Sequence, residues 1–214
     1  MSEFARVRVK VCGITRLEDA LQAVRLGADA IGLVFAPGSS RCVSLKQARR
    51  ISSAVPPFVT RIALVMDPDP GDLERISGQV SVDLIQFHGS ESDAFCKRSG
   101  RPYIKAISVD ETREPSWDQA YPGALGFIID SHAKGAAGGT GRTFDWRRFP
   151  GPGESTDRPL ILAGGLNVDN VARAIRECRP YAVDVSSGVE SSPGVKDKAL
   201  MRRFMTEVQG ASNS

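Results

Sequence analysis

Residues 7–36 read VRVKVCGITRLEDALQAVRLGADAIGLVFA and contain one complete strand–helix–strand unit. The opening VRVKV alternates apolar and basic side chains and ends at Cys12 and Gly13, which indicates a strand that breaks into a loop. Apolar residues then recur at positions 17, 20, 21 and 24 with the period of a helix, and the apolar run AIGLVFA follows. This order and spacing predict a βαβ unit of a parallel sheet.

The same unit recurs along the chain. Eight short apolar runs are present, in the order VRVKVCG, AIGLVFA, RIALVM, LIQFHG, PYIKAISV, GFIID, LILAGGL and AVDVSSG. Helical periodicity is found between several of them, over residues 17–26, 45–54, 72–80 and 168–175. We therefore predict a single-domain (βα)₈ TIM barrel over residues 1–209, followed by a disordered tail over residues 210–214.

A doubly wound open sheet is the alternative to the barrel. Such a sheet usually has the glycine-rich turn G-x-G-x-x-G after its first strand. The first strand of this chain is followed by CGIT, which lacks that pattern. The number of strands and the missing motif both favour the barrel.

Charge and composition narrow the classes of partner. The 214 residues include 28 basic and 25 acidic side chains, and the basic clusters RVRVK and DWRRF are short with little aromatic interleaving. We expect no nucleic-acid partner, because a nucleic-acid-binding surface has a stronger basic stripe. No long apolar segment is present, so we expect neither a secretory signal nor a membrane span, and we place the protein in the cytoplasm.

Cysteine and histidine are sparse. The four cysteines have no metal-ligand spacing and the chain has two histidines, so we expect no metal site. We expect Cys42, Cys96 and Cys178 to be small buried hydrophobic residues. Cys12 differs because it follows a strand at the rim of the barrel. A positive field from Lys10 or from backbone dipoles would favour its thiolate, which could act as a base or a nucleophile.

Polar residues end most of the predicted strands, and in a (βα)₈ barrel these ends meet at one rim where catalytic groups concentrate. Asp130 follows two isoleucines, and a carboxyl group in apolar surroundings can serve as a general acid, although Asp130 could equally cap the next turn. Arg41 could bind a carboxylate or be a plain loop cation. His88 could bind a ligand or close its loop. Asp184 interrupts an apolar strand and needs a buried partner.

Glycine-rich loops follow the last two predicted strands, in AGGL and SSG. Exposed backbone N–H groups and a helix N-terminus form an anion site, and the phosphate of (βα)₈ enzymes is commonly bound there. We therefore predict phosphate binding, the alternative being tight turns alone. Two long connections, residues 110–123 and 132–144, also suggest function, and we expect the GGTG at 138–141 to be a mobile lid.

Taken together, these motifs resemble the phosphoribosylanthranilate isomerase family. The matching stretches are VKVCGIT, GLVFAPGSSR, LIQFHGSE, IIDS followed by GGTG, LAGGL and VDVSSGVESSPGVKD, and they cover the whole barrel. The resemblance implies the Amadori rearrangement of N-(5-phosphoribosyl)anthranilate in tryptophan biosynthesis, with Asp130 as general acid and Cys12 as general base. It implies no cofactor, and a monomer or a homodimer that takes one small phosphorylated sugar–anthranilate substrate.

The resemblance also assigns the remaining site residues. Arg41 would bind the anthranilate carboxylate, and His88 and Asp184 would contact or support the ligand. The phosphate would be bound by Gly164, Gly165, Ser187 and Gly188.

Other functions remain as alternatives. A Schiff-base aldolase of the same fold would use Lys105, in YIKAI, as its nucleophile. A non-catalytic phosphate-binding protein would keep both glycine loops and need neither Cys12 nor Asp130. A second, larger substrate of histidine biosynthesis is disfavoured, because the middle strands have no second copy of AGGL.

Overall fold

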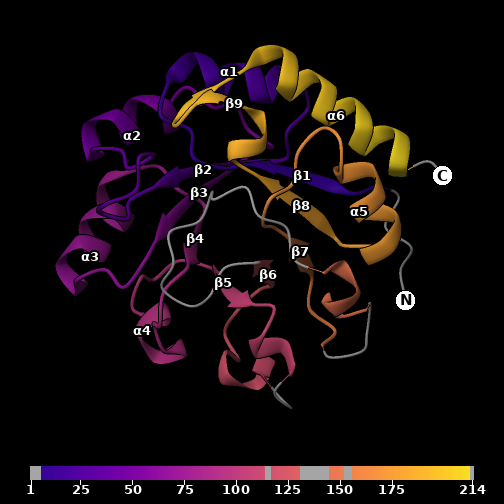
Figure 1. The fold of residues 1–214 in the computed structure, drawn as a ribbon. Coiled ribbons are helices and arrows are strands. Elements are labelled where there is room, and N and C mark those ends of the chain that lie inside the picture. Colours follow the sequence, from indigo (N-terminus) through magenta and orange to yellow (C-terminus); the bar gives the residue numbers. More distant parts are fainter. Residues whose placement is uncertain (1–5, 114–116, 131–144, 152–155, 213–214) are drawn as a thin grey trace.

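The structure is a computed structural model that describes residues 6–113, 117–130, 145–151 and 156–212. Eight parallel strands are hydrogen-bonded in sequence order, and the first pairs with the last to close the barrel (Figure 1). Arg8 and Val11 of the first strand lie opposite Ala182 and Val185 of the last. This closure confirms the predicted (βα)₈ barrel and excludes the open sheet.

The barrel strands are β1 (Arg8–Val11), β2 (Ala30–Val34), β3 (Thr60–Val65), β4 (Leu84–Phe87), β5 (Tyr103–Ser108), β6 (Phe127–Asp130), β7 (Leu160–Leu162) and β8 (Ala182–Val185). An antiparallel hairpin follows, made of β9 (Glu190–Ser192) and β10 (Val195–Lys196). The helices outside the barrel are α1 (Leu17–Arg25), α2 (Leu45–Ser52), α3 (Pro70–Gln79), α4 (Asp93–Lys97), α5 (Val171–Cys178) and α6 (Lys198–Ser212). Single 3₁₀ turns are η1 (Glu111–Arg113), η2 (Trp117–Ala120), η3 (Trp146–Arg148) and η4 (Ser187–Val189).

The four predicted helices are all present, with shifted ends. Helix α5 begins at Val171 rather than at residue 168, and the predicted connection 110–123 contains the two 3₁₀ turns η1 and η2. Periodicity did not predict α4, which has five residues, or α6. Helix α6 continues to Ser212 and buries Ala211, so the chain is helical beyond residue 210, where we expected the tail to begin.

Each strand has one face inside the barrel and one face under the helices, because successive strand residues point in opposite directions. The inner face buries a layer that includes Ile62, Ile104, Ala106 and Ile128. The opposite face of each strand packs against the helices in a larger core. On β5, for example, Ile104 belongs to the inner layer, whereas its neighbours Tyr103 and Lys105 are buried outside that layer. Strand parity therefore decides which side chains can reach the barrel mouth.

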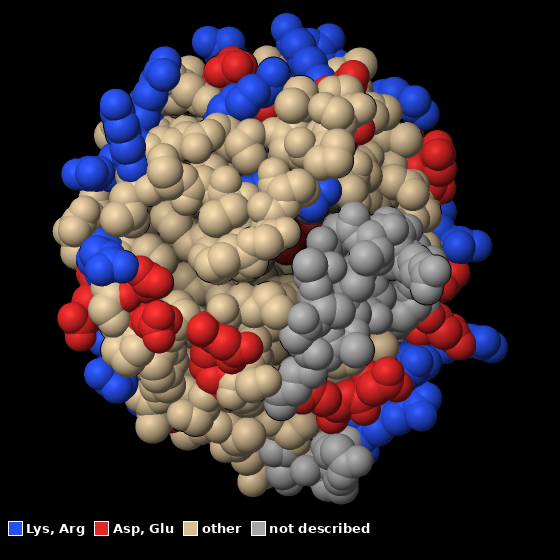
Figure 2. Space-filling view, turned by 60° about the vertical axis from the view of Figure 1, so that its left-hand side comes forward, with Lys and Arg blue, Asp and Glu red and all other residues tan. Residues whose placement is uncertain are grey.

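The surface carries charges of both signs. Figure 2 shows basic and acidic side chains interspersed around one face, with a hollow near its centre that uncharged residues largely border. Within the described part of the chain, no helix combines the length and the apolar character that a bilayer span requires.

Candidate active site

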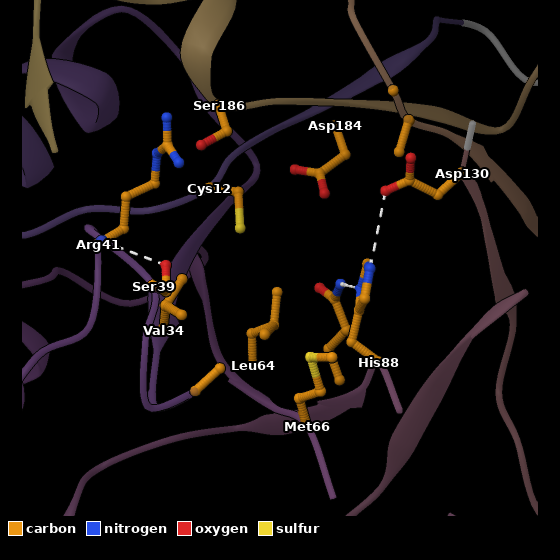
Figure 3. Close-up of a pocket in the computed structure, with 14 residues that line it drawn as sticks. Cys12, Val34, Ser39, Arg41, Leu64, Met66, His88, Asp130, Asp184 and Ser186 are labelled. Atoms are coloured by element: carbon orange, nitrogen blue, oxygen red, sulfur yellow. Dashed lines mark hydrogen bonds and ion pairs between the residues drawn. The ribbon is translucent and has the colours of Figure 1, made fainter. Parts of the chain in front are cut away.

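A cavity opens at the carboxyl ends of the strands, and fourteen residues line it (Figure 3). Six of the predicted site residues are among them, and these are Cys12, Arg41, His88, Asp130, Gly164 and Asp184. The other three, Gly165, Ser187 and Gly188, are not lining residues of this cavity. The alternation of side chains along each strand explains why these residues meet in one cavity. The inward-facing positions at the strand ends are occupied by Cys12, Gln86, Asp130 and Asp184.

Cys12 and Asp130 lie on opposite sides of this cavity. Cys12 follows β1, Asp130 ends β6, and both are nearly buried, with 6% and 8% of their surfaces exposed. Figure 3 shows the sulfur of Cys12 and the carboxyl group of Asp130 turned toward the same space. A thiol and a carboxyl group can therefore reach two sides of one small molecule.

Asp184 has the buried partner that its position in the strand required. Lys10 Nζ donates to Asp184 Oδ2 at 2.8 Å across the β1–β8 seam, and both side chains are less than a tenth exposed. Burial alone would lower the pKa of Lys10, but the charges of Asp184 and of the Cys12 thiolate outweigh burial and raise it. Lys10 is therefore a cation next to Cys12.

The state of Cys12 differs from our expectation. We expected nearby positive charge to supply thiolate at neutral pH, but burial raises the pKa of the Cys12 thiol. Lys10 and Lys196 oppose this effect and Asp184 adds to it. Desolvation is therefore the larger influence, because the sulfur lies inside the barrel mouth rather than in open solvent.

His88 directly follows β4, and its side chain contacts Asp130. His88 Nε2 lies 3.8 Å from Asp130 Oδ2, and Gln86 Nε2 lies 3.3 Å from His88 Nδ1. When Gln86 donates this hydrogen bond, the neutral imidazole carries its proton on Nε2, facing Asp130. His88 thus has contacts on the cavity side and does more than close its loop.

Two buried acceptor atoms in the cavity have no hydrogen-bond partner among the described residues. They are Gln86 Oε1 and Asp184 Oδ1. Buried acceptors are normally paired, so both atoms are suited to receive hydrogen bonds from a ligand. Sequence reasoning missed Gln86, although the alternation in LIQFHG places it on the same face as His88.

Arg41 lies at the edge of the cavity near Ser186 (Figure 3) and already has an acidic partner. Its Nε and Nη2 donate to the two carboxylate oxygens of Glu190 at 2.9 and 2.7 Å. Sequence reasoning did not identify Glu190, which is 149 residues away along the chain.

The cavity wall below Arg41 is apolar. Val34, Leu64 and Met66 line it beside Cys12 (Figure 3). An aromatic ring that entered the cavity would lose water against this wall, and burial of such surface stabilises a complex by about 25 cal/mol per Å².

The two glycine loops lie against each other. Gly164 and Gly165 have φ values of +87° and +66°, which favour glycine. At Gly188 a Cβ would overlap the backbone oxygen of Leu166, so the loops after β7 and β8 meet without room for a side chain. The SSG loop continues into the single turn η4 and the hairpin rather than into a long helix.

The structure decides two further expectations, and a third falls on residues that it does not describe. Lys105 does not line the cavity; its Nζ donates to the backbone oxygens of Gly89 and Ala106 at 2.7 and 3.0 Å, so the aldolase alternative is wrong. Cys42 is exposed, contrary to our expectation, whereas Cys96 and Cys178 are buried. The proposed lid at 138–141 lies outside the described residues.

Comparison with known proteins agrees with this geometry. The family model of N-(5'phosphoribosyl)anthranilate (PRA) isomerase matches residues 9–207. The N-(5'-phosphoribosyl)anthranilate isomerase of Halorhodospira halophila is 49% identical over 95% of this chain and 97% of its own length. That of Nitrosococcus oceani is 50% identical over 97% and 100%.

Solved structures give the same result. The phosphoribosyl anthranilate isomerase of Thermus thermophilus superposes with a TM-score of 0.85 at 37% identity, over 95% of this chain and 99% of the other. A phosphoribosyl anthranilate isomerase in complex with reduced 1-(o-carboxyphenylamino)-1-deoxyribulose 5-phosphate superposes with a TM-score of 0.76 at 39% identity, with the same coverage.

Proposed function

Because the chain belongs to the N-(5'-phosphoribosyl)anthranilate isomerase family, we propose that Cys12 and Asp130 carry the proton transfers of its Amadori rearrangement. The observation that supports this assignment is their position on opposite sides of one cavity. A base and an acid placed in this way can act on two faces of the same sugar.

The reaction divides into two proton transfers. Asp130 protonates the furanose ring oxygen, the bond from that oxygen to C1′ breaks, and a Schiff base forms with the anthranilate nitrogen. Cys12 then removes the proton from C2′, and the resulting enolamine tautomerises to the ketone. One proton is donated and one is accepted, so the two groups return to their starting states by exchange with solvent.

The remaining residues orient the substrate. Arg41 binds the anthranilate carboxylate, and the aromatic ring packs on the wall of Val34, Leu64 and Met66. Gln86 and Asp184 accept hydrogen bonds from the ribose hydroxyl groups, because each has a buried oxygen without a partner among the described residues. His88 supports Asp130 through its contact at 3.8 Å.

The phosphate is bound at the loops after β7 and β8, by Gly164, Gly165, Ser187 and Gly188. Support comes from the positive φ values of the first two residues and from the close approach of the two loops at Gly188. Gly164 also lines the cavity, so a phosphate bound at these loops would lie at the cavity's edge.

We also propose that the enzyme acts in the cytoplasm, without a nucleic-acid or membrane partner, as a monomer or a homodimer. A solved relative from Thermotoga maritima is described as monomers generated from a dimeric isomerase. Light scattering of the purified chain coupled to size-exclusion chromatography distinguishes the two states.

The assignment of acid and base is tested with Cys12→Ser and Asp130→Asn. Loss of one general acid or base costs about 10²–10⁴ in rate, so we expect kcat to fall by that factor. Binding of the reduced product analogue changes by less than about threefold, since neither group supplies much of the ligand affinity in this account. The fluorescence decay of freshly generated phosphoribosylanthranilate measures kcat.

A matched control is Cys42→Ser, which changes an exposed thiol outside the cavity and should leave kcat unchanged. If Cys12→Ala and Asp130→Ala both retain full turnover, the assigned acid and base are wrong.

A further inference from the structure

A buried ionic cluster extends from Arg41, which lines the cavity, to two residues outside the cavity lining. It consists of Arg41, Glu190 and Lys196, which we call the Arg41–Glu190–Lys196 cluster. Lys196 Nζ donates to Glu190 Oε1 at 2.6 Å and to the backbone oxygen of Ser186 at 3.1 Å. The side chains of Lys196 and Glu190 are 0% and 4% exposed.

Glu190 occupies one side of the guanidinium group of Arg41 and leaves the other side without a protein partner among the described residues. Glu190 occupies the edge formed by Nε and Nη2, with both bonds shorter than 3.0 Å. Among the described residues, none accepts a hydrogen bond from Nη1. Bidentate pairing fixes the plane of the guanidinium group, so Nη1 is left for a ligand in a defined orientation.

The net charge of the cluster explains why Lys196 is needed for the binding of a carboxylate. Glu190 alone would neutralise Arg41 and leave a substrate carboxylate with no net attraction. Burial lowers the pKa of Lys196, and Glu190 opposes this effect through its charge and its hydrogen bond. With Lys196 protonated, the cluster of two cations and one anion keeps one net positive charge. Arg41 and Lys196 both hold Glu190 as an anion, since their hydrogen bonds and charges lower its pKa against the opposing effect of burial.

The backbone around the cluster is built to hold it. Gly13 has a φ of +73°, and a Cβ there would overlap Arg41 Cδ and come within 2.9 Å of Ser186 Oγ. The β9–β10 hairpin, which carries Glu190 and Lys196, is tied to the start of α1. Thr15 Oγ1 donates to Gly194 O at 2.5 Å, and the backbone N–H of Lys196 donates to Asp19 at 3.1 Å.

We propose that Glu190 is a positioning residue for Arg41, and that the Arg41–Glu190–Lys196 cluster forms the recognition site for the aromatic carboxylate of the substrate. Glu190 orients the guanidinium group and Lys196 restores the positive charge that Glu190 removes. This inference rests on the proposed role of Arg41 in binding the anthranilate carboxylate.

Two ligands test the cluster by calorimetry. One is the reduced product analogue, and the other is the same compound without its carboxylate. The dissociation constant of the second ligand, divided by that of the first, measures how much the carboxylate contributes to binding. In Glu190→Gln we expect this ratio to fall about tenfold, with the dissociation constant of the second ligand unchanged within twofold. We expect KM to rise about tenfold while kcat stays within threefold, which general loosening of the fold would not produce.

The matched control is Glu91→Gln, which makes the same chemical change at another buried carboxylate beside a buried lysine. It should leave the ratio unchanged. Should Glu190→Gln fail to fold, Glu190→Asp retains the charge but withdraws the carboxylate, and the ratio should fall by a smaller factor. Lys196→Met, which removes only the second cation, should also lower the ratio.

An unchanged or larger ratio in folded Glu190→Gln overturns the inference. The proposed function fails separately: if the wild-type ratio is already close to one, Arg41 does not bind the carboxylate. If the wild-type ratio is large and Glu190→Gln leaves it unchanged, Arg41 still binds the carboxylate, but Glu190 does not position it.

Discussion

Two seams of the barrel each contain a buried lysine paired with a carboxylate, and the two pairs lie on opposite faces of the strand wall. At the β1–β8 seam, Lys10 lies 2.8 Å from Asp184, which lines the cavity. At the β4–β5 seam, Lys105 Nζ lies 3.6 Å from Glu91 and donates to the backbone oxygen of Gly89 in the loop after β4. The first pair faces the candidate active site and the second faces away from it.

The difference shows that burial and charge do not identify a functional lysine. Lys10 is two residues from Cys12 on an inward-facing strand position, so its charge acts on the cavity. Lys105 lies between Ile104 and Ala106, which pack inside the barrel, so its own side chain points outward. We therefore expect the inner pair to affect catalysis and the outer pair to affect mainly stability.

The largest expected effect is on stability at the outer pair. Lys105→Met leaves Glu91 buried without its cation, which typically costs about 3–5 kcal/mol. We expect the free energy of unfolding in urea to fall by about this amount. For the molecules that remain folded at 25 °C, kcat/KM should stay within threefold of wild type. A specific loss of kcat in Lys105→Met would remove the distinction between the seams.

The next effect concerns the inner pair. Lys10→Met removes the cation that lowers the pKa of Cys12, and a neighbouring opposite charge shifts a pKa by about 1–3 units. The reactive form requires both thiolate Cys12 and protonated Asp130. At a pH below the pKa of Cys12, each unit added to that pKa reduces the thiolate fraction tenfold.

We therefore expect kcat/KM of Lys10→Met to fall about 100-fold in steady-state assays at constant pH. Comparison with Lys105→Met controls for the loss of a buried lysine as such. Equal activities of the two variants would contradict the functional role of Lys10.

A smaller effect sharpens the account of Cys12 itself. Because burial raises the pKa of this thiol from its ordinary value of 9.0, its thiolate fraction should rise about tenfold per pH unit between pH 7 and 9. Alkylation of Cys12 by iodoacetamide in a Cys42→Ser background, followed by mass spectrometry of the peptide, measures this fraction. The reduced product analogue should protect Cys12. A rate that levels off below pH 9 would show that Lys10 outweighs burial.

The smallest effect concerns Gln86, which lies on β4 but faces the cavity. Its buried Oε1 has no hydrogen-bond partner among the described residues, and a hydrogen bond from a ribose hydroxyl group to this atom would contribute about 0.5–1.5 kcal/mol. We expect Gln86→Leu to raise KM about threefold and to change kcat less. An unchanged KM would show that Gln86 takes no part in substrate binding.

Sequence patterns predicted the fold and several residues that line the cavity, because both follow from local alternation along the strands. The eight apolar runs are the eight strands, and inward parity accounts for Asp130 and for Asp184 beside Lys10. The same alternation excludes Lys105, which the aldolase alternative required as its nucleophile, because Ile104 and Ala106 take the inward-facing positions on either side of it.

Other features depend on contacts that no local pattern contains. Glu190 meets Arg41 across 149 residues, through a hairpin that strand periodicity did not reveal. The pKa of Cys12 depends on the sum of desolvation and three neighbouring charges, and the sequence gives no measure of burial at that sulfur. Helix α4 was missed because five residues are too short for a periodic signal.

A crystal structure of this chain with the reduced product analogue tests the assignment of acid and base most directly. We predict that Cys12 Sγ lies within about 4 Å of C2′. On the opposite face of the sugar chain, an Asp130 oxygen should lie within hydrogen-bond reach, about 2.6–3.2 Å, of the oxygen on C4′. If both groups lie on one face, or if either contacts a different part of the ligand, the proposed division between base and acid is wrong.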